Sequence, residues 1–147
     1  MTRIRMTALV LLVLASVTAR ALGVESVDQL IARANSAPPG SRPGLYLQIA
    51  RQQADSADKF YQAGDAESGN TALNDVLTYS QKATDAAAST GKKLKDTEIA
   101  LRKMAEKFRD VKHNLPFDDQ APVQQAIDRL EKMRTYLLSE MFGKKTK

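Results

Sequence analysis

The sequence predicts an all-α protein, an antiparallel helical bundle of two helical hairpins in which four long helices follow a short leading helix. Apolar residues recur every three or four positions through four long segments, the spacing of an amphipathic helix. Stretches rich in proline and glycine fall between these segments, where they end one helix and start the next. Without its first 19 residues the 147-residue chain keeps 128, which is one ordinary domain able to bury a core. We expect this single all-helical domain to span residues 22–143.

Residues 1–19 have the organisation of a secretory signal peptide. Arg3 and Arg5 give a positive start, and Ala8–Val17 is an apolar core too short to span a bilayer. The small residues that follow predict cleavage after Ala19 or Ala21. A short membrane anchor that is retained is the alternative.

The composition restricts the compartment and the chemistry. The chain has no cysteine, which excludes a lipid-anchored lipoprotein, disulfides, c-type haem attachment and thiolate metal sites. Export without cysteine suits a bacterial periplasmic or secreted protein, and we expect that localisation. The 22 basic and 17 acidic residues give a net charge of +5, and removing Arg3 and Arg5 with the signal peptide leaves +3. This mild charge implies no nucleic-acid partner.

The first element after the signal peptide is a short helix over Leu22–Asn35. Its apolar residues have helical spacing, and Ser26 is placed to cap it. The following segment, Ser36–Gly44, contains three prolines and predicts a stiff loop. Pro43 suits the first turn of the next helix, or the residue before it, because that turn needs no amide donor there.

The central hairpin spans Leu45–Ala88. One helix runs to Ala63, and the turn at Gly64-Asp65 starts a second helix at Ala66, because Gly64 suits a left-handed helix end and Asp65 can accept from free amides. Small residues dominate the inner stripe of the second helix, which allows close approach of the two. Gln53 interrupts the apolar face of the first helix, and we expect its amide to be hydrogen-bonded or at the rim rather than on a ligand.

The run from Phe60 to Leu73, F-Y-Q-A-G-D-A-E-S-G-N-T-A-L, resembles the middle of a tetratricopeptide-type helical hairpin. That family has Gly-Asp at the turn and a small residue five positions later, which Gly64 and Gly69 match, whereas Val76 stands where alanine is usual. The resemblance covers about thirty residues within 45–88, which is one repeat's length, and no second copy follows at that spacing. It implies the geometry of a helical hairpin, not a peptide-binding groove. Packing as a short array of this type is the alternative to an up-down bundle.

The second helical pair begins near Lys92. Gly91 predicts a break, although one helix running through a lone glycine is the alternative. The helix Lys92–Leu115 carries the most cationic face of the chain, which we expect to be solvated or to make weak contact with an anionic partner. The basic side chains of this face are Lys92, Lys95, Arg102, Lys103, Lys107 and Arg109.

A second proline-containing loop, Asn114–Pro122, leads into the last helix, Val123–Phe142, which has the strongest apolar periodicity. Asp118 or Asp119 is placed to cap that helix, and Phe117 is expected to tuck between helix ends. Arg134 lies within the apolar stripe, where it either extends out to solvent, which we favour, or pairs with a carboxylate of another helix. Residues 144–147 form a basic tail that we expect to be disordered.

The sequence presents no pattern that assigns a catalytic, metal or cofactor residue. His113 is the one histidine, and a zinc site needs three or four ligands. A b-type haem could use His113 with a core methionine, for which the candidates are Met104, Met133 and Met141. Methionine at core spacing is, however, ordinary packing material.

These observations favour an exported helical protein-interaction or adaptor module without catalytic activity. Its expected partner is a protein of the cell envelope, with no nucleic acid and no stable membrane insertion after cleavage. A homodimer is left open, because Leu137, Leu138, Met141 and Phe142 offer apolar surface. The alternative function is a small haem-binding electron carrier of four-helix-bundle type.

Overall fold

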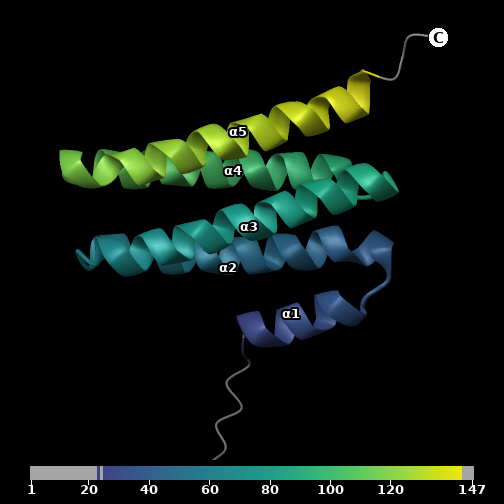
Figure 1. Ribbon diagram of the computed structural model, residues 1–147, viewed down its shortest axis with the longest axis horizontal. Helices are drawn as coiled ribbons and strands as arrows, with labels where there is room; N and C mark the ends of the chain where they lie inside the picture. Colours follow the sequence, from purple (N-terminus) through teal and green to yellow (C-terminus); the bar gives the residue numbers. More distant parts are fainter. Residues whose placement is uncertain (1–22, 24, 144–147) are drawn as a thin grey trace, which may run out of the picture.

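The computed structural model describes residue 23 and residues 25–143. Over these residues the protein is all-α, with five α-helices, two short 3₁₀ turns and no strand. The expected signal peptide and the basic tail lie outside the described residues. In Figure 1 the helices form three tiers, with α1 below the α2–α3 pair and the α4–α5 pair above it.

The leading helix α1 spans Val27–Ser36, five residues later than the start expected from the sequence. Ser26 caps it as predicted, because its hydroxyl accepts from the Gln29 amide while the Gln29 side chain accepts from the Ser26 amide. Leu30 and Ala34 pack on Leu45 and Ile49 of α2, so α1 covers one side of the first hairpin. The expected proline loop contains the 3₁₀ turn η1, Pro39–Ser41.

The first hairpin consists of α2, Arg42–Gln62, and α3, Ala66–Thr90. Its predicted turn is confirmed: Gly64 has a φ of 77°, and the Asp65 carboxylate accepts from the Ser68 amide at 3.1 Å. Hydrogen bonding by the side chain and then by the amide of Ser68 lowers the pKa of Asp65. Gln53 is half-buried, and its amide donates to Asp75 of α3 at 3.1 Å, which confirms a satisfied amide.

The second hairpin consists of α4, Leu94–His113, and α5, Gln120–Phe142. The question left open at Gly91 is answered, because this residue has a φ of 67° and ends α3. Lys93 is also left-handed, with a φ of 61°. Two left-handed residues within three positions turn the chain sharply, which is why α4 starts at Leu94 rather than at Lys92.

The loop between α4 and α5 departs from two predictions. Phe117 does not tuck between helix ends but is 86% exposed within the 3₁₀ turn η2, Phe117–Asp119. Asp119 precedes α5, yet no side-chain cap is made there. The turn itself supplies the transition, because the Gln120 amide bonds to the Phe117 carbonyl and the chain enters α5 without a separate cap.

The two hairpins stack with their first helices in contact with each other and their second helices in contact with each other. Besides the pairs within each hairpin, α3 packs on α5 and α2 packs on α4. Figure 1 shows that α2 and α4 run in one direction while α3 and α5 run in the other. Buried apolar residues from all four helices form one main core, with Phe108, Leu130 and Leu137 fully enclosed.

Arg134 does not extend freely to solvent, contrary to the favoured prediction. Its Nε donates to Glu98 of α4 at 2.6 Å, and its Nη1 lies 3.3 Å from Glu131. Glu131 also accepts from Arg109 at 2.9 Å, while Arg102 approaches Glu98 at 3.9 Å. The hydrogen bond that Arg134 donates to Glu98 raises the pKa of Arg134, since it stabilises the cation. These alternating charges tie α4 to α5.

Candidate functional site

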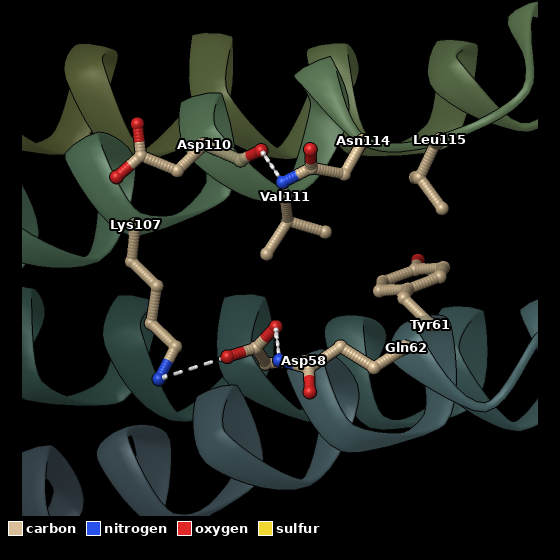
Figure 2. Close-up of a pocket in the computed structure, with 8 residues that line it drawn as sticks. All are labelled: Asp58, Tyr61, Gln62, Lys107, Asp110, Val111, Asn114 and Leu115. Carbon is tan, nitrogen blue, oxygen red and sulfur yellow. Dashed lines mark hydrogen bonds and ion pairs between the residues drawn. The ribbon is translucent and has the colours of Figure 1, made fainter.

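A cleft of about 600 Å³ opens between the C-terminal ends of α2 and α4. Figure 2 shows Val111 and Leu115 projecting from α4 and the residues after it towards the Tyr61 ring, which rises from α2. Three of the eight lining residues are apolar or aromatic, and the other five are polar or charged. The full lining comprises Asp58, Tyr61, Gln62, Lys107, Asp110, Val111, Asn114 and Leu115.

Tyr61 forms the floor of the cleft and is fixed by α3. Its ring is 6% exposed, and its hydroxyl donates to Asn70 Oδ1 at 2.7 Å. Gly69 lies directly under the ring, where an added Cβ would come within 2.7 Å of a ring carbon. Burial raises the pKa of Tyr61 to about 12, and the carboxylate of Asp119 adds to the effect. The floor is therefore rigid, neutral and hydrogen-bonded.

Lys107 closes the inner side of the cleft. Its ammonium reaches from α4 to α2, where it lies 2.6 Å from Asp55 and 3.7 Å from Asp58. Asp58 in turn accepts from Gln62 Nε2 at 2.9 Å. Figure 2 shows Lys107 extended across the gap towards Asp58. This bridge joins the two hairpins at the point where the apolar packing between α2 and α4 gives way to open space.

The electrostatic balance around the cleft is negative. One ammonium, that of Lys107, faces the carboxylates of Asp55 and Asp58. The exposed carboxylate of Asp110 adds charge at the rim, and within the described part of the chain it makes no ion pair. Asp119 stands close enough to act on Tyr61. The cleft therefore combines an apolar interior with an acidic surround, a combination suited to a ligand that carries both apolar and cationic groups.

The cationic face expected on α4 is partly neutralised. Lys107 and Arg109 pair with carboxylates of α2 and α5, and Arg102 lies 4.0 Å from Glu106 of its own helix. The remaining members, Lys92, Lys95 and Lys103, are exposed and make no ion pair with a described residue. Weak contact with an anionic partner through these three lysines stays a prediction.

The arrangement of His113 does not favour the haem alternative. His113 is exposed at the end of α4, whereas Met104 and Met133 are buried in the core. Nine residues of α4 separate Met104 from His113, which is roughly 13 Å along the axis. Lys112 bonds to Gln124 at 2.7 Å, so Gln124 of α5 lies beside the end of α4. Met133 is nine residues further along α5 and is therefore displaced from His113 by a similar distance, and Met141 is displaced by more. Opposite faces of one iron need ligand atoms within a few ångströms of each other.

Among the described residues, no group of three or more histidine or acidic side chains is arranged to hold a metal ion. No helix between residues 25 and 143 combines the length and the hydropathy needed to cross a bilayer.

Comparison of the chain with family models, curated proteins and solved structures gives no match. The resemblance of residues 45–88 to a tetratricopeptide hairpin thus stays a prediction.

Sequence patterns did not locate the cleft. It is made by residues of α2 and α4 that are about fifty positions apart, as Lys107 and Asp55 are, and no local pattern encodes such a pairing. One signal was available in retrospect: Gly69 sits within a helix, where glycine is unfavourable, and eight positions after a tyrosine. A buried glycine in a helix interior indicates that something bulky lies against it.

Proposed function

We propose that the protein is an exported helical interaction module without catalytic activity, and that it binds a protein partner of the cell envelope at the α2–α4 cleft. The observation that carries the proposal is the cleft itself, where Tyr61, Val111 and Leu115 lie among five polar side chains. Specific protein interfaces have that anatomy, an apolar centre from which water is excluded and a polar margin that sets orientation. Its export rests on the signal-like residues 1–19.

The stacking of the hairpins supports this use of the cleft. The apolar stripes of all four long helices are consumed in the shared core, so the bundle is complete without a partner. The cleft walls are held from behind, by the Tyr61–Asn70 hydrogen bond on the α2 side and by the hydrogen bond from Lys112 to Gln124 of α5 on the α4 side. Rigid walls reduce the ordering cost of association, which favours binding.

Rim substitutions test the proposal without disturbing the core. Gln62→Arg and Asn114→Arg change one exposed residue on each wall, and Gln125→Arg places the same added charge at an exposed position of α5 that does not line the cleft. Each chain, including the parent, is immobilised and exposed to envelope extract of the host, and bound proteins are quantified by mass spectrometry. We expect at least one protein that the parent and Gln125→Arg retain and both rim variants lose. Equal capture by all four chains contradicts the proposal.

A further inference from the structure

The net positive charge of the chain comes from residues other than those that the structure describes. The described residues contain 16 basic and 17 acidic side chains, a net charge of −1, although the whole chain has +5. The six remaining basic residues are Arg3, Arg5, Arg20, Lys144, Lys145 and Lys147. Three of the six therefore follow the end of α5 within five residues. A nearly neutral body with an acidic cleft thus carries a concentrated basic segment at its C-terminal end.

An apolar side chain immediately precedes these lysines. Phe142 is the last residue of α5 and is 66% exposed, and the sequence continues G-K-K-T-K. The cleft offers the complementary groups in the same combination. Its interior is lined by Val111, Leu115 and the Tyr61 ring, and Asp58 and Asp110 stand at its margin. An aromatic ring followed by lysines matches this arrangement in both polarity and charge.

The segment cannot reach the cleft of its own chain. Figure 1 shows the C-terminal end of α5 and the loop joining α4 to α5 at opposite ends of the bundle. Gln120, at the start of α5, bonds to the Leu115 carbonyl at 3.0 Å, so the cleft lies beside the first turn of that helix. The 23 residues of α5 extend about 34 Å. Lys147 follows Phe142 by five residues and therefore lies within roughly 17 Å of it.

We propose that the cleft binds the C-terminal segment Phe142–Lys147 of a second copy of this chain, with Phe142 in the apolar interior and the lysines against the acidic margin. The inference deepens the proposed function and rests on it, because it uses the same cleft. The contact joins the head of one copy to the tail of the next. Such a heterologous contact leaves a free cleft and a free tail, so copies add in chains unless a ring closes. A tail and an envelope partner compete for the cleft.

The strength of this contact follows from its composition. One aromatic ring and a few exposed ion pairs give a weak complex, with a dissociation constant on the order of 0.01–1 mM. The proposed contact lies at the protein surface, so salt screens the attraction between its charges. We expect association to weaken about tenfold or more when ionic strength rises from about 0.05 M to about 0.5 M.

Two full-length variants and their mixture test the inference by sedimentation velocity. The head variant carries Gln62→Lys and Asp110→Lys, and the tail variant carries Lys144→Glu, Lys145→Glu and Lys147→Glu. Each alone should stay monomeric at concentrations up to about 1 mM, where the parent associates. Their mixture should form a one-to-one complex, because one copy keeps a functional tail and the other a functional cleft. Gln125→Lys serves as the charge control and should behave as the parent.

Three outcomes overturn the inference: a parent that stays monomeric, a tail variant that associates as strongly as the parent, and variants that fail to complement each other in the mixture. Circular dichroism of each variant establishes that its helices are intact. The envelope-capture experiment reports separately on the proposed function. Loss of a captured protein in the rim variants, together with a monomeric parent, leaves the proposed function standing and removes the second copy as the occupant.

Discussion

Replacing Gly69 with alanine tests the construction of the cleft floor. Gly69 is buried within α3, and a Cβ built on it would lie 2.7, 2.8 and 2.9 Å from three carbons of the Tyr61 ring. Real Cβ atoms do not approach so closely, so either the ring or the helix has to move. The ring is held by burial and by its 2.7 Å hydrogen bond to Asn70. Displacing the ring therefore breaks that bond as well.

Two effects of opposite sign decide the outcome. Alanine is favoured over glycine in a helix interior by about 1 kcal/mol. Overpacking a closed site costs roughly 1–3 kcal/mol, and losing the Tyr61–Asn70 hydrogen bond costs about 1 kcal/mol more. The unfavourable effects are larger, so Gly69→Ala should lower the free energy of unfolding by roughly 1–3 kcal/mol. Gly44 is the matched control, because nothing lies within 4 Å of a Cβ there and Gly44→Ala should be neutral or stabilising.

Urea unfolding followed by far-ultraviolet circular dichroism measures both changes. The double variant Tyr61→Leu with Gly69→Ala gives the coupling between the two sites. Removing the ring removes the clash, so alanine at position 69 should then be neutral or stabilising in the Tyr61→Leu background. The reasoning is refuted if Gly69→Ala is as stable as the parent in the presence of Tyr61. It is also refuted if the cost of Gly69→Ala is unchanged when the ring is absent.

Three further predictions concern charge and backbone. The pKa of Tyr61 is about 12 in the folded protein, whereas its ordinary value is 10.0. The stability that comes from burying the neutral phenol is therefore complete below pH 10 and is lost as the pH rises towards 12. Between these pH values Tyr61→Phe should lose less stability than the parent, by up to about 3 kcal/mol in urea titrations. Glu98→Gln should lower the melting temperature more than Glu106→Gln, because Glu98 is 8% exposed and accepts a hydrogen bond from Arg134, whereas Glu106 faces solvent. Equal shifts of the melting temperature in calorimetry would show that the Glu98–Arg134 pair contributes nothing to stability. Lys93→Gly should stabilise the protein by up to about 1 kcal/mol, because glycine adopts the left-handed backbone at this position without strain. A destabilised variant would show that the Lys93–Asp96 ion pair contributes more to stability than the strain removes.

The sequence predicted those features that local chemistry determines. Ser26, Gly64, Asp65 and Gly91 each act on the backbone within a few residues, so the caps and turns that they form were predicted, although α1 starts five residues later than expected. Arg134 was misjudged because a residue of another helix sets its environment, and Phe117 because no other element covers it. Glu98 is 36 residues from Arg134 along the chain. The cleft belongs to this second class, since helical periodicity identifies an inner face but not its neighbour.

The stacking of the hairpins explains why the surface available for recognition is polar. In the main core, α2 and α3 contribute mostly alanine near their contact, Ala50, Ala54, Ala57 and Ala72 among them, which lets the first hairpin close tightly. Between α2 and α4 the last contacts are instead a lysine bridging two aspartates. Exposed ion pairs of this kind contribute little to stability and exchange readily for others. A cationic partner that replaces Lys107 at Asp58 therefore meets a small energetic barrier, whereas one seeking the apolar core would have to unfold it. A reversible contact at the cleft margin is therefore the association that requires the smallest structural change in this fold.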